Sequence, residues 1–391
     1  MPRAVVLHSL IEGVGGAEKV GLYTARALAD LGYKATLVTH ARVALEKLAH
    51  DIGIDLAGVN ILDPGTSPVE EALYKLLGGR AAEYRRLIAV YKAMALLETL
   101  DYDLSVETQS NIPFPADIAY IHFPVLARRL VYGDGGPMRR FYDWLSERRA
   151  VRLSWPRQAQ LLAANSEWTS RLVHRAYGRP ACVLHPPVET RASPRAKENL
   201  AVTVSRFTPE KKLETLLSIA PSLRGLGLKL VVLGGVYGRS SKRYFEELRR
   251  RSGSLESVEL IANPPREEVE DYLARARFYI HPPFIEHFGI AVAEAAQLGA
   301  IPLVYRNGGA WTDIASRIDG RLGYENVGEV PTILDRIVST PGLEEKLREK
   351  SIRVGNTFRY NVFRDRLSDL VKLPGRICPG YSESDSRGPL N

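Results

Sequence analysis

The chain has 391 residues, of which 45% are hydrophobic and 25% charged, and its formal net charge is +8 at pH 7. This length exceeds what one hydrophobic core usually serves, so two domains are expected. The positive charge favours anionic partners, namely nucleotides, phospholipid surfaces or nucleic acid, and does not choose among them.

The first half of the chain predicts a doubly wound α/β domain. The apolar run at 4–10 predicts a buried strand, and glycines follow it. An amphipathic helical pattern then ends at Gly32, and the apolar run at 35–40 completes a β-α-β unit. Two further strands are expected at 103–107 and 117–122.

The second half repeats this alternation. Strands are expected at 201–207, 229–235, 258–262, 278–283 and 300–305, and helices at 210–224, 240–252, 266–276 and 289–298. Such alternation indicates a parallel sheet covered on both faces. The segment 185–199 is rich in proline and charge, which is typical of an interdomain linker.

We therefore expect the α/β class, with two Rossmann-like doubly wound domains at 1–187 and 188–354. A last helix is expected at 355–373, packing back on the first domain, and a disordered tail at 374–391. Ligands of such sheets bind beyond the carboxyl ends of the strands. Polar residues in the loops that follow strands are therefore the functional candidates.

The strongest motif is EHFGIAVAE, which runs from Glu286 to Glu294 and enters a helix near Gly289. The backbone N–H groups of Phe288, Gly289 and Ile290 would point out of the helix start and favour a diphosphate. Glu286 would reach ligand hydroxyls, and Glu294 would accept hydrogen bonds from a ribose diol. Either glutamate alone is more simply explained as a helix charge, but the combination favours a functional site.

Two cations follow the first strand of the second half, in the segment SRFTPEK at 205–211. Arg206 supplies a fork of donors and Lys211 a mobile point charge, which suits a diphosphate leaving group. Cations held there would stabilise the charge that develops as a nucleoside diphosphate departs. A solvated helix start is the simpler alternative, and Lys212 fits it.

The segment GVGGAE at 13–18 argues against a dinucleotide site. The pattern G-x-G-x-x-G would need glycine where Glu18 stands, and the second strand ends in His40 rather than in an acidic residue. An NAD-dependent oxidoreductase is therefore disfavoured. A tight strand-to-helix turn accounts for at least one of these glycines.

The segment at 286–294 resembles the Glu-x7-Glu signature of retaining glycosyltransferase family 4, the glycosyl transferases group 1. EHFGIAVAEA is most similar to the α-1,2-mannosyltransferases of dolichol-linked oligosaccharide assembly, and the resemblance covers roughly residues 5–320. It implies a GT-B fold, in which two Rossmann-like domains face a central cleft. It also implies a hexosyltransferase that retains anomeric configuration, with GDP-mannose as the favoured donor and a lipid-linked oligosaccharide as acceptor.

The resemblance further assigns catalytic roles to four residues. It implies that Arg206 and Lys211 hold the diphosphate, and that His122, at the end of an apolar strand, lies beside the transferred sugar. We interpret His122 and Glu286 as groups that orient the sugar. The departing phosphate would itself help to deprotonate the acceptor, so no enzymic nucleophile is expected.

Donor-binding roles follow in the same way. The resemblance implies that Gly15 and Gly16 face the donor phosphates, and that Asn263 contacts the nucleobase, although a simple turn at Asn263 is equally open. Backbone amides at 307–309 would complete the sugar pocket. The segments 165–168 and 185–187 match the hinge-side pattern of the family and are expected to serve interdomain structure.

No cofactor or metal is expected besides the donor substrate. The Asp-x-Asp pair Asp101 and Asp103 precedes a strand instead of following one, so we expect metal-independent transfer. Cys182 and Cys378 are the only cysteines. They predict neither a disulfide framework nor a cysteine zinc site, and they fit a reducing compartment.

The N-terminus lacks a signal-peptide pattern, and no apolar run reaches the ~18–20 residues that span a bilayer. We expect a cytoplasmic protein, soluble or peripheral on the cytoplasmic membrane face. The arginine-rich, aromatic segment 128–157 is a candidate for an anionic membrane surface or, equally, a solvated helix face.

Two alternatives remain open. The first is a family member that uses UDP-glucose, UDP-N-acetylglucosamine or another donor on a different acceptor. The second is a basic nucleic-acid-binding protein on a Rossmann-like scaffold. Nucleic acid as a partner is disfavoured, because it would not explain why four polar motifs all fall on loops that follow strands.

Overall fold

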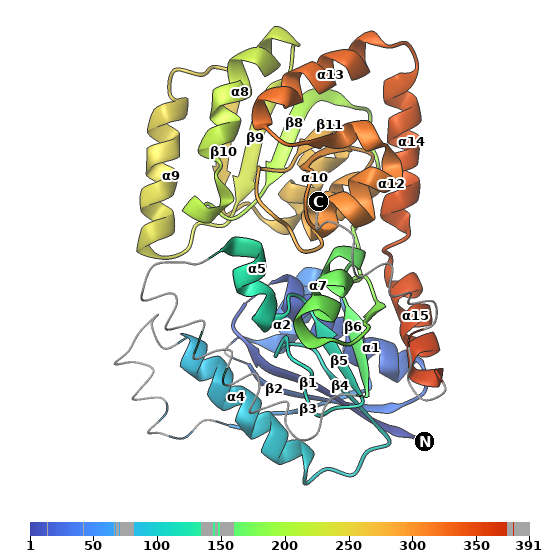
Figure 1. Cartoon of the computed structure of the whole chain (residues 1–391). Helices are drawn as coiled ribbons and strands as arrows, with labels where there is room; N and C mark the ends of the chain where they lie inside the picture. Colours follow the sequence, from blue (N-terminus) through green and yellow to red (C-terminus); the bar gives the residue numbers. More distant parts are fainter. Residues whose placement is uncertain are drawn as a thin grey trace. The chain divides into compact units, whose positions relative to one another are not determined.

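The computed structural model describes residues 1–373, apart from 14, 42, 66, 68–69, 71–81, 134–143, 145–147 and 149–159, and also Cys378. The chain divides into two compact units (Figure 1). The first comprises Met1–Asn165, Thr169–Pro187 and Tyr360–Gly388, and the second comprises Ser166–Trp168, Val188–Arg359 and Pro389–Asn391. The tail predicted to be disordered lies outside the described residues, except for Cys378.

The first unit contains a seven-stranded sheet in the order β3-β2-β1-β4-β5-β6-β7, with neighbouring strands parallel. Its strands are β1 Arg3–Ile11, β2 Lys34–Ala41, β3 Val59–Leu62, β4 Leu104–Glu107, β5 Ile118–Ile121, β6 Leu161–Ala164 and β7 Cys182–Val183. Its helices are α1 Gly16–Asp30, α2 Leu45–Ile52, α4 Ala82–Leu97, η2 Val125–Ala127, α5 Arg128–Tyr132, most of α7 Glu167–Tyr177, and α15 Tyr360–Lys372.

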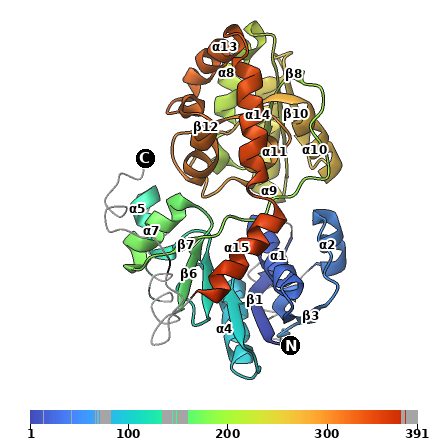
Figure 2. The ribbon, with the colours of Figure 1, turned by 90° about the vertical axis from the view of Figure 1, so that its right-hand side faces the viewer.

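Buried strand β1 shows how helices cover both faces of this sheet. Ala4 and Val6 belong to one apolar cluster, and Val5 and Leu7 belong to another. Successive side chains of a strand point to opposite faces, so the continuous apolar run fills both layers. The first cluster includes residues of α1 and α15, which lie side by side in Figure 2, and the second includes residues of α4 and α7.

The second unit contains a six-stranded parallel sheet in the order β10-β9-β8-β11-β12-β13. Its strands are β8 Glu198–Val204, β9 Lys229–Gly234, β10 Val258–Ala262, β11 Ala276–Ile280, β12 Ile301–Tyr305 and β13 Gly323–Tyr324. Its helices are η3 Pro209–Lys211, α8 Glu214–Gly225, α9 Gly238–Ser252, α10 Arg266–Arg275, α11 Ile290–Gln297, η4 Ala310–Ala315, α12 Ser316–Ile318, η5 Gly320–Leu322, η6 Val327–Glu329, α13 Val330–Ser339 and α14 Leu343–Asn356. This is the predicted doubly wound arrangement.

Two predicted helices differ most in their bounds. The helix expected at 210–224 starts only at Glu214, because Lys212 takes the left-handed conformation (φ 50°) and separates it from the short turn η3. The last helix expected at 355–373 is α15, which begins only at Tyr360, because residues 355–356 still belong to α14. In the first unit, α15 packs on α1, where the Tyr360 hydroxyl donates to Asp30 Oδ2 (2.5 Å).

The prediction that the cysteines form no disulfide is wrong. Cys182 of β7 and Cys378 form a disulfide bond across 196 residues of sequence. The bond removes the argument for a reducing compartment. No spacing in the sequence could indicate this pair, because only the fold brings the chain beyond α15 to β7.

The boundary between the two units, at Pro187 and Val188, falls within the predicted linker at 185–199. From Val188 onward it belongs to the second unit. The backbone N–H groups of Arg191 and Ala192 donate to Glu270 Oε2 (2.8 and 2.9 Å) on α10. A buried carboxylate thus binds the part of this polar segment that belongs to the second unit. Among the described residues, no helix is long and apolar enough to cross a membrane.

Candidate active site

The centre of the second sheet brings together two of the predicted motifs. Strands β8 and β11 are neighbours, and the chain order of the sheet reverses between them. The loops beyond the carboxyl ends of such strands are the usual ligand site of this fold. The loop after β8 carries Lys211 and the loop after β11 carries Glu286, and Lys211 Nζ lies 3.5 Å from Glu286 Oε2.

Lys211 is largely buried, with 18% of its side chain exposed. Its ammonium also lies over the ring of Phe284, 3.7 Å from the centroid, which is a cation–π contact. Burial lowers the pKa of Lys211, the carboxylate of Glu286 opposes that shift, and the charge of Arg206 adds to it. Arg206 itself is exposed. Two cations therefore lie together with two carboxylates, Glu210 and Glu286, and the cations are the groups of this set that can bind a diphosphate.

Glu286 is an ionised carboxylate at neutral pH. Burial alone would raise its pKa, but His281 and Lys211 lower the pKa to about 2. His281 Nε2 lies 3.9 Å from Glu286 Oε2. His281 is buried in the strand-end sequence FYIHPP, and its ring packs against Phe284. Sequence analysis missed His281, because a histidine at the end of an apolar strand has no distinguishing pattern.

Two glycines hold the Glu286 loop against the loop after β12. Glu286 and Gly308 form a backbone bridge, and Gly309 N donates to Glu286 O (2.8 Å). A Cβ at Gly308, where φ is +93°, would lie 2.4 Å from Glu286 O, and one at Gly309 would lie 2.0 Å from His287 O. Only glycine permits this approach. The amides of Asn307 and Gly309 therefore bond within the protein, which removes them from the predicted sugar pocket.

The segment Ser166–Trp168, which belongs to the second unit, supports the same two loops. Ser166 Oγ donates to His287 O (2.6 Å), and Trp168 Nε1 donates to Asn307 Oδ1 (3.0 Å). The Trp168 and His287 rings stack with an interplanar angle of 9°. Within this unit, the segment fixes the residue that follows Glu286 and the Asn307 side chain of the loop after β12.

The helix that carries the predicted anion site starts where the sequence placed it, and anion binding there stays a prediction. Helix α11 begins at Ile290, and Gly289 is its N-cap in the left-handed region (φ 97°). The first N–H groups of a helix have no partner inside the helix, and they carry the positive end of its dipole. The Phe288 side chain is buried against Phe358, so it anchors this helix start in the core.

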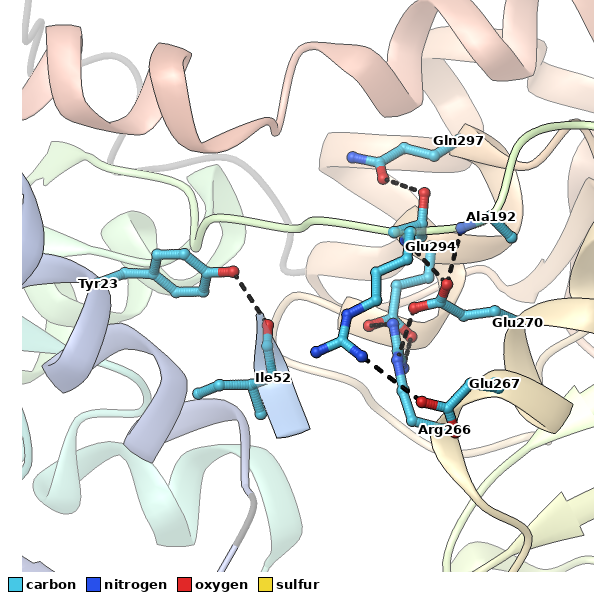
Figure 3. Close-up of polar contacts among 10 residues, drawn as sticks. Tyr23, Ile52, Ala192, Arg266, Glu267, Glu270, Glu294 and Gln297 are labelled. Carbon is cyan, nitrogen blue, oxygen red and sulfur yellow. Dashed lines mark hydrogen bonds and ion pairs between the residues drawn. The ribbon is translucent and has the colours of Figure 1, made fainter. Parts of the chain in front are cut away.

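Glu294 is buried and held by an arginine that sequence analysis missed. Arg266, the first residue of α10, donates from Nη2 to Glu294 Oε1 (2.7 Å) and from Nη1 to Oε2 (3.0 Å) (Figure 3). Arg266 Nε also donates to Glu270 Oε1 (2.8 Å). A carboxylate has about four acceptor positions, and this bidentate arginine occupies two of them. The alternative of an exposed helix glutamate is excluded, because Glu294 is 3% exposed.

Asn263 has a structural role in the loops after β9 and β10. Its N–H donates to Gly234 O (2.8 Å), and its Oδ1 accepts from Val236 N (2.7 Å). It takes the left-handed conformation (φ 53°), which asparagine tolerates better than most residues. The turn interpretation of Asn263 is thus supported, and its contact with a nucleobase stays a prediction.

Three predicted site residues belong to the first unit. Gly15 is the N-cap of α1, and Gly16 is its first residue. His122 directly follows β5, and its Nε2 lies 2.9 Å from Thr108 O. The expected strand-to-helix turn and strand-end histidine are therefore present. Their proposed contacts with a donor stay predictions.

Two family models match the chain in consecutive segments. The model described as "Glycosyltransferase Family 4" matches residues 14–192, and the model described as "Glycosyl transferases group 1" matches residues 189–354. Together they include all the predicted site residues. The chain belongs to this glycosyltransferase family.

The glycosyltransferase has relatives that are named GDP-Man:Man(3)GlcNAc(2)-PP-Dol alpha-1,2-mannosyltransferase. The protein of Dictyostelium discoideum is 25% identical over 54% of this chain and 48% of its own length. The human protein is 28% identical over 41% of this chain and 37% of its own length. The protein of Xenopus laevis is 25% identical over 79% of this chain and 62% of its own length. The chain thus spans less than two thirds of the length of each of these relatives.

Solved structures of GT-B type share the fold of the glycosyltransferase. HepE of Anabaena, solved in complex with UDP and glucose, has a TM-score of 0.68 at 16% identity and covers 95% of this chain and 100% of its own. WaaG, a glycosyltransferase involved in lipopolysaccharide biosynthesis, has a TM-score of 0.69 at 15% identity, and the match covers 94% of this chain and 99% of WaaG. The predicted GT-B fold class, with two Rossmann-like units, is confirmed.

Proposed function

We propose that this glycosyltransferase transfers a hexose, mannose from GDP-mannose, with retention onto a lipid-linked oligosaccharide. The observation that carries the proposal is the arrangement of the two motif glutamates. Glu286 Oε2 lies 3.5 Å from Lys211 Nζ, beside the start of α11. Glu294 lies within that helix and accepts hydrogen bonds from Arg266. The names of the relatives support mannose, GDP and the lipid-linked acceptor.

In this proposal each of these groups contacts a different part of the donor. Lys211, Arg206 and the first amides of α11 hold the diphosphate and stabilise the charge that develops as it leaves. Glu294 accepts hydrogen bonds from the ribose. Glu286 and His122 orient the transferred sugar, and the departing phosphate takes the acceptor proton.

We also propose that transfer needs no metal ion. Asp103 Oδ2 accepts from Arg3 N (2.7 Å), and Asp101 pairs with the Arg3 side chain. Both aspartates therefore lie at the amino end of the first unit's sheet, opposite the loops that follow its strands. Activity that survives EDTA supports this proposal, and a loss of activity that manganese restores would refute it.

The acceptor chemistry further suggests that the protein acts at an anionic membrane surface through segment 128–157. The described part of that segment exposes Leu130 (56%), Tyr132 (46%) and Trp144 (42%), next to Arg128 and Arg129. Apolar and cationic side chains together suit the headgroup region of a bilayer. Binding to anionic but not to neutral vesicles, lost on Leu130→Ser with Tyr132→Ser, would support it.

The test of the proposed activity is donor binding and transfer with GDP-mannose, UDP-glucose and UDP-N-acetylglucosamine. These donors share the ribose and diphosphate, so the same site can hold each of them. Calorimetry should show binding of one donor, which Glu294→Gln weakens. Glu349→Gln is the control, because that glutamate is exposed on α14. If only a UDP-sugar binds, the transferred sugar is the one that this donor carries and not mannose. If none of the three donors binds, the proposal is overturned.

A further inference from the structure

A buried carboxylate outside the predicted site lies at the carboxyl end of β4. Glu107 is the last residue of this strand and is 1% exposed. Its Oε1 accepts from Gln109 N (2.7 Å) and Ser110 N (2.6 Å), and its Oε2 accepts from Ser110 Oγ (2.6 Å). One side chain thus satisfies three donors of the turn that follows its own strand.

This turn holds His122 by both its ring and its backbone. Thr108 O lies 2.9 Å from His122 Nε2. Asn111 Oδ1 accepts from His122 N (2.7 Å) and from Phe123 N (3.1 Å). The loop after β5 is therefore positioned by the loop after β4.

The contact with Thr108 determines the tautomer of His122. A backbone carbonyl oxygen only accepts hydrogen bonds, so Nε2 must carry the proton. In the neutral ring, Nδ1 then holds the lone pair and is a hydrogen-bond acceptor. A ring in this form suits a partner that donates, such as a sugar hydroxyl.

The same turn is tied to the end of β1. The Gln109 side chain accepts from Leu10 N (2.8 Å) and donates to Leu10 O (2.7 Å). Strand β1 ends one residue later, and the chain continues to Gly15 and Gly16 at the start of α1. The turn 108–111 therefore connects the two places where the first unit carries predicted donor contacts.

We propose that Glu107 is a positioning residue, which holds the turn 108–111 and thereby keeps His122 in the Nε2–H form with Nδ1 as acceptor. The sugar contact of His122 rests on the proposed function, whereas the tautomer does not. Loss of the carboxylate would leave buried backbone donors without partners and allow the turn to move. Misplacement of a positioning group by about 1 Å can lower the rate roughly 10²-fold.

The test combines a spectroscopic and a kinetic readout on Glu107→Ala and Glu107→Gln. Nitrogen-15 spectra of the histidine rings report the tautomer, and His122→Gln identifies the signal. We expect the Nε2–H form in the parent, a mixture of tautomers in Glu107→Ala, and the parent form in Glu107→Gln, whose amide oxygen still accepts the two backbone bonds. The transfer rate should fall in Glu107→Ala and be largely rescued in Glu107→Gln.

Asp117→Asn is the matched control. Asp117 Oδ2 also accepts from a backbone N–H and a serine hydroxyl, both of Ser105, but at the amino end of β4 (2.7 and 2.9 Å). It should leave the His122 tautomer unchanged. If Glu107→Ala does not fold, Ser110→Ala, which removes only the Oε2 partner, should still perturb the His122 signal.

The outcomes separate the two proposals. An unchanged His122 tautomer in folded Glu107→Ala overturns the positioning role, whatever the enzyme transfers. A changed tautomer in a protein that uses none of the donors supports the positioning role while the proposed function fails.

Discussion

Arg266 and Glu294 lie 28 residues apart in sequence and share two hydrogen bonds, of 2.7 and 3.0 Å. The pair joins the start of α10 to the middle of α11. Through Glu270, Arg266 is also connected to the segment at 191–192. The glutamate that we assign to the donor ribose is therefore oriented by a network that includes the entry into the second unit.

Arg266→Ala should both destabilise the second unit and weaken donor binding. Its carboxylate partners are 3–4% exposed, and breaking a buried pair costs about 3–5 kcal/mol because an unpaired charge remains. Arg275→Ala is the control: this arginine is equally exposed, but its partners Asp271 and Glu198 are 34% and 51% exposed. Equal losses of melting temperature in the two variants would contradict the buried role of Arg266.

Lys211→Met should lower the transfer rate by roughly 10²–10³-fold, the usual effect of removing one group that stabilises developing charge. Donor affinity should fall less, because Arg206 and the helix start remain. Lys212→Asn controls for loss of a cation, since asparagine accepts the left-handed conformation of that residue. Steady-state kinetics separate kcat from KM, and a fall in affinity alone would count against charge stabilisation.

Gly308→Ala should separate the Glu286 loop from the loop after β12. The new Cβ would lie 2.4 Å from Glu286 O, at a φ of +93°. We expect loss of transfer with a lower melting temperature. Gly320→Ala is the control, because its Cβ would meet no atom within 4 Å. Wild-type activity in Gly308→Ala would show that the loops need not approach so closely.

Glu107 should make stability depend on pH. Burial raises its pKa from 4.5 to about 7, although Ser110 and Gln109 oppose the shift. Between pH 4.5 and 7 the folded state keeps a proton that the unfolded chain releases, so stability falls as pH rises, by about 3 kcal/mol in all. Melting curves of Glu107→Gln should lack this decline. The same pH dependence of melting temperature in parent and variant would refute this effect of Glu107.

Cys378→Ser should destabilise the first unit by about 2–5 kcal/mol, because a disulfide that closes a long loop restricts the unfolded chain. Cys182→Ser should have the same effect. The parent protein should lose the same stability when a reductant is added, whereas both variants should be unaffected by it. A reductant effect on the variants would point to a cause other than this bond.

Apolar periodicity allowed most of the long elements to be predicted. The strands near 4–10 and 229–235 and the helices near 240–252 and 266–276 are continuous or amphipathic patterns, and the structure confirms them. The short strands β3, β6, β7 and β13 were missed. These strands have only two to four residues, and pairing with a neighbouring strand defines them.

The sequence by itself determined the fold class, the family and the candidates Glu286, Glu294 and Lys211, because local patterns and one specific motif carry that information. Only the tertiary structure decided which groups hold them: Arg266 for Glu294, His281 for Glu286, and the turn of Glu107 for His122. Arg266 and Glu294 come from different helices, the turn after β4 contacts the residue after β5, and His281 and Glu286 meet within the loop after β11. No local pattern encodes these pairs. Packing of the sheets brings them within hydrogen-bonding or electrostatic range, and it also joins Cys182 to Cys378.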